Sequence, residues 1–458
     1  MQPDTTQTRK ARWTRMLASV RNSQTDPAGV VFDITRSPFI QDYDRILFSN
    51  SFRMLARKTQ AHPFATNDHV HHRLMHSLEV SSVGRSLGIM VGYFLKERQE
   101  LPDAITPEHI GQIVQAACLA HDIGNPPLGH AGEEAIRHWF THSPVGKAMR
   151  DVMNDDEAAD FEFYEGNAQG FRVLTRLEMP DQAGGMQLTC ATLAAFAKYP
   201  CASRVMVRPT GVAGKKFNFF RAEEQLFREM AEHTGLVQTG PWAWQRHPLA
   251  YLVEAADDIA YRIVDFEDGQ RLGLVSYQEL EQLFLEIIDS ERSAEYVATI
   301  ASPLRKSEFL RAQVIGRLVG ECTKAFIDHH EELLSGTLEK PLLSYIGCQE
   351  PLRRIEARST RDIYQHRAVA EVIGAGFEMV SGMLDIFVPC VNEMALEATG
   401  GKTASFRSRR LSALLPDMAE NLADEEWRRS AYLRLLRVLD YVSGMTDSYA
   451  VSLFQKLK

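Results

Sequence analysis

Apolar residues recur at the three- and four-residue spacing of an α-helix through most of this 458-residue chain, from about residue 40 to 268 and again through the last third. Hydrophobic residues make up 45% of the chain and charged residues 24%, values that are ordinary for a globular protein. The pattern predicts an all-α fold with a large packed core, because each such helix has an apolar stripe to bury.

Four polar stretches interrupt the helical pattern and indicate loops, at residues 60–70, 141–165, 180–187 and 202–218. One segment, 204–220, places Val205 and Val207 in alternation with polar residues and contains Gly211 and Gly214, which predicts a short β-hairpin. No other segment carries a β signal. The predicted fold class is therefore all-α with at most a short β-hairpin.

The overall charge and the cysteine pattern limit the class of protein. A formal net charge of -9 argues against a globally basic nucleic-acid binder. Six cysteines lie without a CxxC pair, which favours a reducing compartment over a disulfide framework. Since the N-terminus lacks a secretory apolar stretch and no run of about 18 apolar residues occurs, a cytoplasmic location without membrane association is expected.

The helix before His121 shows how the chain delivers a polar side chain to the interior. Thr106 and Pro107 form an N-cap and first-turn pair, and an apolar stripe follows at helical spacing. His121 lies four residues after Ala117, on the buried side of this helix. Residues 122–127, DIGNPP, must end the helix because glycine and two prolines do not continue one.

A His-Asp pair at such a helix end offers one nitrogen and one carboxylate oxygen to a single cation. On its own the pair is weak evidence for a metal. Its setting strengthens the prediction, since further candidate ligands lie in HHRLMHSLEV (71–80) and EAADDIAYRIVDFEDG (254–269), on either side of AACLAHDIGNPPLGHAGEEAI (116–136).

These segments resemble the HD-domain superfamily and, within it, the deoxyguanosinetriphosphate triphosphohydrolase-like (dGTPase-like) family. Further matches are RILFSNSFRMLARKTQ (45–60), EGNAQGFRVL (165–174), AKYP (197–200) and DYVSGMTDSYA (440–450). Residues 1–30 are polar, with mixed charge and an Asp26-Pro27 pair, and predict a flexible N-terminal arm. An HD-domain helical core that carries catalysis (31–270) and additional C-terminal helices packing on that core (271–458) are expected to follow.

The resemblance implies that His76, His121, Asp122 and Asp257 are the metal ligands. Helical geometry favours Asp257 over Asp258, because Asp257 shares one face with positions 261 and 265. Asp258 points about 100° away and is expected to pair with Arg262. His72, one turn before His76, is the rival for that ligand and is read as a surface or supporting histidine.

The resemblance also implies a proton-transfer pair. His130 and Glu133 lie three residues apart on one helical face, with His130 moving the proton and Glu133 orienting it. Two alternatives stay open, that Glu133 only complements the helix dipole and that Glu134 takes its role.

The remaining candidate residues would bind substrate. Arg73 and Lys198 offer cationic donors to phosphates, with Tyr199 as a further candidate and a solvated Lys198 as the alternative. Tyr261 would contact a phosphate, and Asp265 the sugar 3′-hydroxyl. Four other positions complete the set: Gln60 near the sugar or base, Asn125 where many HD hydrolases have His, and Asn167 and Gln169, each of which also fits a helix start.

The activity implied by the resemblance is metal-dependent hydrolysis of a deoxynucleoside triphosphate, with dGTP preferred or all dNTPs accepted, to deoxynucleoside and tripolyphosphate. A divalent ion suits a polyanionic substrate; Mn or Mg is expected, and Fe, Co, Ni or Zn fits the same mixed ligands. Two alternatives are another nucleotide substrate, monophosphate or cyclic, and a nucleotide- or single-stranded-DNA-binding regulator. The resemblance also implies a homo-oligomer such as a hexamer. A nucleotide or single-stranded DNA effector is a separate expectation. The basic cluster at Arg407, Arg409 and Arg410 is read as solvated surface.

Overall fold

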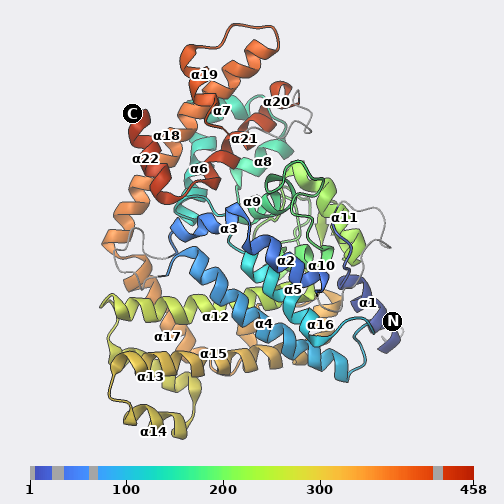
Figure 1. Ribbon diagram of the computed structural model, residues 1–458, viewed down its shortest axis with the longest axis vertical. Helices are drawn as coiled ribbons and strands as arrows, with labels where there is room; N and C mark the ends of the chain where they lie inside the picture. Colours follow the sequence, from blue (N-terminus) through green and yellow to red (C-terminus); the bar gives the residue numbers. More distant parts are fainter. Residues whose placement is uncertain (1–5, 23–35, 61–70, 416–425) are drawn as a thin grey trace.

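The computed structural model describes residues 6–22, 36–60, 71–415 and 426–458, and in these the chain is almost entirely helical (Figure 1). The first half contains α1 (Thr6–Met16), α2 (Pro38–Leu47), α3 (Asn50–Met54), α4 (Arg73–Glu97), α5 (Pro107–Ala120), α6 (His130–His142), α7 (Pro144–Arg150), α8 (Asp155–Glu162), α9 (Gly166–Arg172), α10 (Cys190–Phe196) and α11 (Glu224–Thr234). The second half contains α12 (Pro248–Arg271), α13 (Tyr277–Ile288), α14 (Glu291–Thr299), α15 (Pro303–Asp328), α16 (His330–Ser335), α17 (Gln349–Ser359), α18 (Arg367–Ala398), α19 (Phe406–Ser412), α20 (Glu426–Arg429), α21 (Ala431–Gly444) and α22 (Asp447–Leu457). Short 3-10 turns η2 (Leu55–Arg57), η4 (Gly211–Gly214), η5 (Arg221–Glu223) and η6 (Leu342–Tyr345) and π-helical turns η3 (Val173–Leu177) and η7 (Thr360–Tyr364) join them.

Helices α4 and α5 form the closest helix pair, and a glycine stripe on α4 makes this possible. Gly84, Gly88 and Gly92 recur every four residues and face α5. A Cβ at Gly88 would lie 2.8 Å from the Gly111 Cα, so only glycine allows the two backbones to approach this closely. Because α4 and α5 carry His76 and His121, this packing fixes the separation of two candidate ligands.

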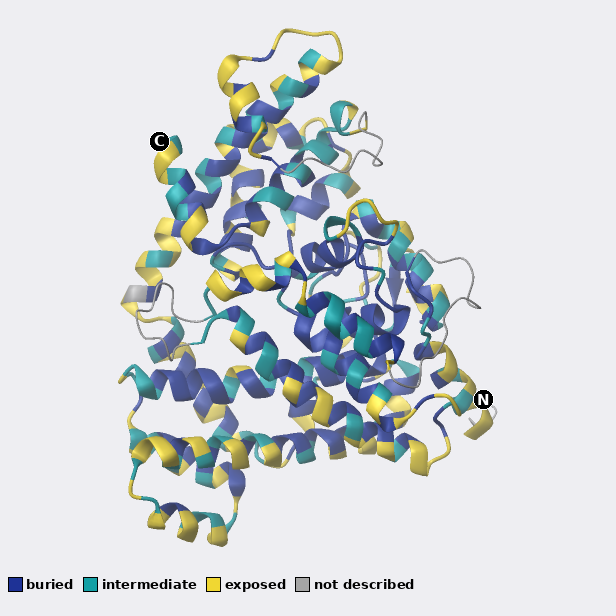
Figure 2. Cartoon of the chain, in the orientation of Figure 1, coloured by how far each residue is buried: buried dark blue, intermediate teal, exposed yellow. Residues whose placement is uncertain are grey.

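Two separate hydrophobic clusters hold the chain together (Figure 2). The first cluster joins α1–α5, α10–α13, α15 and α17. The second joins α6 and α8 to the C-terminal helices α18, α21 and α22. Residues 275–363 thus share the core of the α4–α5 pair, and residues 379–453 build a second core on α6. The predicted boundary at 270 does not coincide with this division.

The structure corrects three expectations. The hairpin forms not at 204–220 but at β1 (Gln238–Gly240) and β2 (Ala243–Trp244). The expected segment forms the turn η4 and one isolated bridge, in which Phe219 pairs in parallel with Ala202. The stretch 141–165 contains α7 and α8, capped by Ser143 and Asn154.

The third correction concerns the N-terminal arm, which includes a docked helix where the structure describes it. In α1 the Trp13 ring is fully buried, and Arg21 forms a buried ion pair of 2.9 Å with Asp42. This helix has 11 residues and buries only Trp13 and Met16, so its apolar periodicity does not stand out in a polar sequence. Residues 23–35 lie outside the described part of the chain.

Helix α18 is long and apolar enough to span a membrane by length and composition alone. Its apolar residues Met383, Leu384 and Phe387 are buried in the second hydrophobic cluster, where α18 packs against α6, α21 and α22.

Candidate active site

A cavity of about 650 Å³ lies where the two hydrophobic clusters meet. Its walls come from α4, the end of α5, α6, α12, η7 and α18. The lining side chains are Thr59, Gln60, Arg73, His76, His121, Asp122, Asn125, Leu128, His130, Ala131, Asn167, Lys198, Tyr199, Lys216, Asp257, Asp258, Tyr261, Thr360, Tyr364, Val369 and Ile373. Of the residues predicted for the site, Glu133, Gln169 and Asp265 do not line it.

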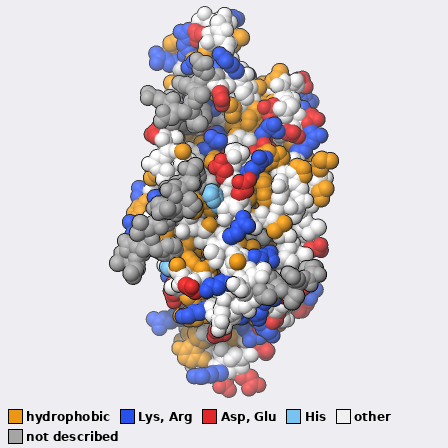
Figure 3. Space-filling view, turned by 90° about the vertical axis from the view of Figure 1, so that its right-hand side faces the viewer, with side chains coloured by type: hydrophobic (Ala, Val, Ile, Leu, Met, Phe, Trp, Pro, Cys, Tyr) orange, Lys and Arg blue, Asp and Glu red, His pale blue; other side chains and the backbone are white. Residues whose placement is uncertain are grey.

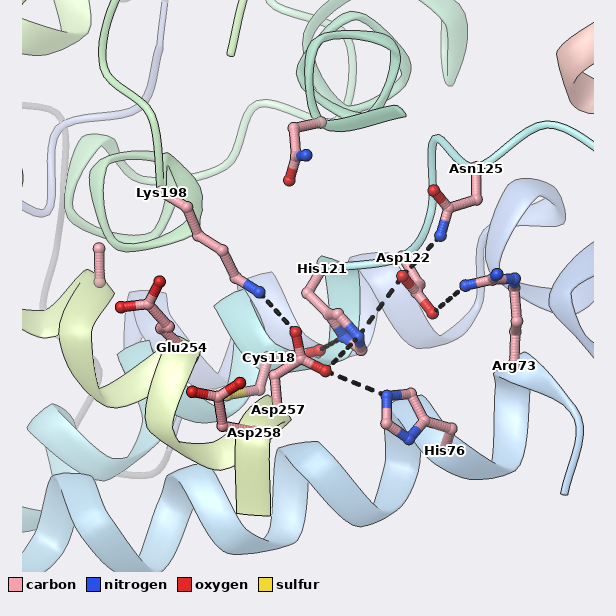
Figure 4. A network of polar contacts seen from close by, with 12 residues as sticks. Arg73, His76, Cys118, His121, Asp122, Asn125, Lys198, Glu254, Asp257 and Asp258 are labelled. Carbon is pink, nitrogen blue, oxygen red and sulfur yellow. Dashed lines mark hydrogen bonds and ion pairs between the residues drawn. The ribbon is translucent and has the colours of Figure 1, made fainter. Parts of the chain in front are cut away.

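The four predicted metal ligands converge at one end of the cavity (Figure 4). Ligand atoms of His76, His121 and Asp122 lie within 4.8 Å of one another. Asp257 Oδ1 is 3.2 Å from His76 Nε2 and 3.4 Å from His121 Nε2. Three long helices supply them, α4, the C-cap of α5 and α12, so the cluster is fixed by the packing of the first core.

His121 is oriented so that its Nε2 faces the carboxylates of the site. Its Nδ1 lies 2.8 Å from the Cys118 carbonyl oxygen, which only accepts, so Nδ1 carries a proton. Nε2 is then the ring nitrogen that points toward Asp122 and Asp257, and it is the one available to a metal ion. This buried Nε2 makes no hydrogen bond in the described structure. A buried ring nitrogen without a hydrogen bond among carboxylates suits a divalent cation, and the mixed nitrogen and oxygen donors fit one.

The carboxylates of the cluster are kept ionised by neighbouring cations. Arg73 donates to Asp122 Oδ2 at 2.6 Å, and Lys198 to Asp257 Oδ2 at 2.6 Å. Burial would raise the pKa of both aspartates, but Arg73 beside Asp122 and Lys198 beside Asp257 hold each pKa below its usual range. Although burial opposes it, Asp122 and Asp257 raise the pKa of His121. The site therefore attracts positive charge.

The two rival ligands have other partners. Asp258 forms an ion pair of 3.3 Å with Arg262, as predicted, and Figure 4 shows no contact from it to the cluster. Burial raises the pKa of Asp258 to about 6. His72 is the N-cap of α4 and accepts from the Met75 N–H through Nδ1. The geometry favours Asp257 and His76.

His130 and Glu133 form a hydrogen-bonded pair at the start of α6. The distance from His130 Nδ1 to Glu133 Oε2 is 2.6 Å, and Gly166 N donates to Glu133 Oε1 at 2.6 Å. Burial acts to raise the pKa of Glu133, but the bond from His130 outweighs it and lowers the pKa to about 2. Glu134 is 63% exposed and pairs with Arg137. Glu133 thus supports a His130 ring whose side chain is 81% exposed at the cavity.

Tyr261 and Asp265 of α12 are joined by a residue that the sequence prediction missed, Tyr364, which lines the cavity together with Tyr261. The Tyr364 hydroxyl donates to Asp265 Oδ2 at 2.8 Å, and its ring stacks on Tyr261 at 5.2 Å. Asp265 is buried behind Tyr364, and burial raises its pKa to about 7. Asp265 therefore lies behind Tyr364 and does not itself line the cavity.

The predicted amides divide between the cavity and the packing behind it. Asn125 donates to Asp122 Oδ1 at 2.6 Å, and Gln60 has a buried Oε1 without a hydrogen bond among the described residues. Asn167 lines the cavity, whereas Gln169 points away and donates to Asp440 on α21 at 2.9 Å.

Lys216 is the second residue that the sequence prediction missed. It lines the cavity and pairs with Glu165 at 3.0 Å. Burial opposes its charge, but Glu133 and Glu165 raise its pKa. Lys216 lies in the segment expected to be a hairpin, so no local pattern pointed to the site.

Charges of both signs are interspersed on the outer face shown in Figure 3, without a continuous basic field in the part that is described. In the cluster at 407–410, Arg409 pairs with Glu397 at 2.6 Å and Arg410 stacks over Phe406. This is the arrangement of a solvated surface.

Comparison with known proteins adds two family models and several relatives. The HD domain matches residues 73–160, and the phosphohydrolase-associated domain matches residues 403–456. A deoxyguanosinetriphosphate triphosphohydrolase-like protein of Pseudomonas aeruginosa (strain LESB58) is 43% identical over 93% of this chain and 94% of its own length. One of Synechocystis sp. is 42% identical over 92% and 94%. The deoxyguanosinetriphosphate triphosphohydrolase of Klebsiella pneumoniae (strain 342) is 29% identical over 98% of both chains.

Proposed function

The chain belongs to the deoxyguanosinetriphosphate triphosphohydrolase-like proteins and is a triphosphohydrolase with an HD domain, and from this premise we propose that it hydrolyses dGTP, or dNTPs generally, with a divalent metal ion. The products are the deoxynucleoside and tripolyphosphate, with one water consumed. The observation that carries this is the convergence of His76, His121, Asp122 and Asp257 at one end of a cavity with His130 in its wall.

These four residues would hold Mn or Mg, with Fe, Co, Ni or Zn compatible with the same donors. When bound, the ion neutralises phosphate charge, polarises the α-phosphorus and lowers the pKa of a water. Asn125 and Arg73 each hydrogen-bond to Asp122, and Lys198 to Asp257, so these side chains orient the ligands.

Three cationic side chains in the cavity wall, Arg73, Lys198 and Lys216, supply charge and donors for a triphosphate. His130 Nε2 transfers the proton between the reacting groups while Nδ1 stays bonded to Glu133. Ionised Glu133 stabilises the protonated ring, which lets His130 act as the acid for the leaving 5′-oxygen.

The part of the cavity wall formed by Tyr261 and Tyr364 suits the sugar and base. Tyr261 and Tyr364 present stacked rings, and Asp265 orients Tyr364 through its hydroxyl, so the role of Asp265 toward the sugar is indirect. Gln60 and Asn167 offer amide groups within the same cavity, where they would contact the nucleoside.

The proposed setting is a homo-oligomer in the cytoplasm. The family resemblance favours a hexamer, and light scattering measures the oligomeric state. A nucleotide or single-stranded DNA effector is tested by measuring activity with each one added. The cytoplasmic location is supported by the six cysteines, all within the described residues and all free.

The test is a product assay. Metal-stripped protein, resupplied with Mn or Mg, is incubated with each dNTP and with GTP in ¹⁸O-water, and products are separated by chromatography. Metal-dependent deoxynucleoside plus ¹⁸O-labelled tripolyphosphate, absent in His121→Ala, supports attack at the α-phosphorus. Release of diphosphate or orthophosphate would assign another phosphohydrolase reaction, and tight binding without turnover a regulatory role.

A further inference from the structure

Three segments far apart in the sequence meet beside the cavity in a buried joint, made by Lys58–Thr59, Asn125–Leu128 and Ser443–Asp447. The first follows α3, the second follows the candidate ligand Asp122, and the third links α21 to α22. The third segment also lies within the phosphohydrolase-associated domain. The joint is therefore a place where the C-terminal region contacts the active-site loop directly.

Asp447 is the centre of this joint. Its Oδ2 accepts from Thr59 N at 2.8 Å and from Thr59 Oγ1 at 2.7 Å. Its Oδ1 accepts from Leu128 N at 2.9 Å. Asp447 is only 2% exposed, yet all three donors belong to residues that line the cavity. One carboxylate on α22 thus holds two separate stretches of the cavity wall.

Lys58 makes a second connection across the joint. Its Nζ donates to the carbonyl oxygens of Asn125 and Ser443, both at 2.6 Å. Lys58 is 3% exposed, so the two carbonyls replace water for its donors. The loop after Asp122 is consequently fixed at both Asn125 and Leu128.

The loop needs such support because its backbone is strained. Leu128 has φ +63°, in the left-handed region that side chains other than glycine rarely adopt, and Gly129 follows with φ +57°. A conformation of this kind persists only when its surroundings determine it. The turn lies directly before His130, so its geometry sets where the His130 ring enters the cavity.

Helix α18 supports the same turn from the other side. A Cβ added at Gly376 would lie 1.8 Å from Leu128 Cδ1, so the Leu128 side chain already fills the space against the α18 backbone. Leu128 is therefore held by its N–H on α22 and by its side chain on α18.

We propose that Asp447 is a positioning residue for the reaction, holding the strained turn so that Asn125 faces Asp122 and His130 faces the substrate. The kinetic effect of this role rests on the proposed triphosphohydrolase activity. Its structural effect on the turn does not. It makes the C-terminal region a part of the active site and not only a cover for the HD core.

Asp160 provides a matched control. Like Asp447 it is a buried aspartate, 1% exposed, that accepts three hydrogen bonds and links the HD part to α21: from Ser203 Oγ at 2.6 Å, Tyr432 Oη at 2.6 Å and Arg221 N at 2.7 Å. It does not line the cavity. Asp447→Asn and Asp160→Asn each exchange one acceptor oxygen for an amide, so both loosen the attachment of α21 and α22.

The first measurement is amide hydrogen exchange, which needs no substrate. In Asp447→Asn the peptide covering residues 122–132 is expected to exchange about tenfold faster, because only one acceptor oxygen remains for the Leu128 N–H and the two Thr59 donors. In Asp160→Asn this peptide exchanges as in the wild-type protein, with faster exchange confined to the contacts of Asp160. Equal protection of 122–132 in Asp447→Asn and wild type would overturn the positioning role.

The second measurement is steady-state kinetics with dGTP or the best dNTP, together with Mn binding. Asp447→Asn is expected to lower kcat by about tenfold to a hundredfold while Mn affinity stays within about twofold, since the metal ligands are held by α4, α5 and α12. Asp160→Asn keeps kcat within about twofold at a matched loss of Tm. Equal kcat in the two variants would overturn the kinetic part.

The two proposals fail separately. A wild-type protein that hydrolyses no dNTP under any metal would end the proposed function, and the exchange experiment would still decide whether Asp447 holds the turn. If the wild-type protein hydrolyses dNTPs and Asp447→Asn leaves loop exchange and kcat unchanged, the proposed function is supported and the positioning role of Asp447 is contradicted.

Discussion

Two parts of the cavity wall, the candidate metal end (His76, His121, Asp122 and Asp257) and the His130 end (His130 and Glu133), are built in different ways. At the candidate metal end, His76, His121 and Asp257 project from helices of one hydrophobic cluster, and Lys198 pairs with Asp257. At the His130 end, His130 is exposed and follows a strained turn that the second cluster and α22 support. The candidate metal end thus depends on the packing of one core, whereas the His130 end depends on contacts with helices of the second core. Metal binding and proton transfer should therefore be separable by mutation.

The largest effect is expected at the metal end. Asp257→Asn removes the charge that Lys198 and both histidines face, so metal binding should fail and turnover should fall by about four orders of magnitude or more. Metal content by mass spectrometry and dNTP turnover check this. Asp258→Asn is the matched control, expected to retain the metal because Asp258 pairs with Arg262. Loss of metal in the control alone would reverse the ligand assignment.

The second prediction separates the two ends. His130→Ala and Glu133→Gln should lower kcat by about 10²–10⁴-fold with metal affinity unchanged, because the pair moves a proton and does not bind the ion. Glu134→Gln should behave as wild type, since its side chain is 63% exposed. Parallel loss of metal in His130→Ala would show that the two ends are not independent.

The third prediction tests the backbone contact that joins the metal loop to α9. A Cβ at Gly124 would lie 2.0 Å from Gly170 N and 2.2 Å from Gly166 O, so Gly124→Ala should lower the free energy of unfolding by about 3 kcal/mol. Gly374→Ala, at an exposed position in α18 with nothing near its added Cβ, should instead be neutral or stabilising by up to about 1 kcal/mol. Urea unfolding measures both, and a tolerated Gly124→Ala would mean that the loop adapts.

The smallest effect is a pH dependence of the metal-end scaffold. Burial opposes a charge on His71, but hydrogen bonds to Asp268 and Glu79 raise its pKa to about 10. The folded protein keeps this proton where the unfolded chain has lost it, so the contribution is full below about pH 6.5 and disappears as the pH rises to about 10. His71→Gln should remove about 2 kcal/mol of unfolding free energy at pH 6 and little at pH 10. A constant difference across this range would contradict the raised pKa.

Much of the site was predictable because its signals are local. The bounds of α5 follow from the apolar stripe before His121, its start at Thr106–Pro107 and its end before GNPP. The predicted start agrees with the structure to within one residue. The one-face relation that favours Asp257 over Asp258 needs only the helical repeat. Tyr364 and Lys216 gave no such signal, because each reaches the cavity from a segment whose pattern says nothing about where it packs.

The sequence by itself predicted most of the helices and the HD motif, since these depend on residues a few positions apart, and the family resemblance supplied the candidate metal ligands. Only the tertiary structure decided that the cavity lies between two cores and that Asp265 lies behind Tyr364. It also decided that Asp447 holds Thr59, 388 residues away. The physical reason is that helical periodicity and caps are set by neighbours along the chain, whereas a hydrogen bond between distant segments depends on how all the intervening helices pack.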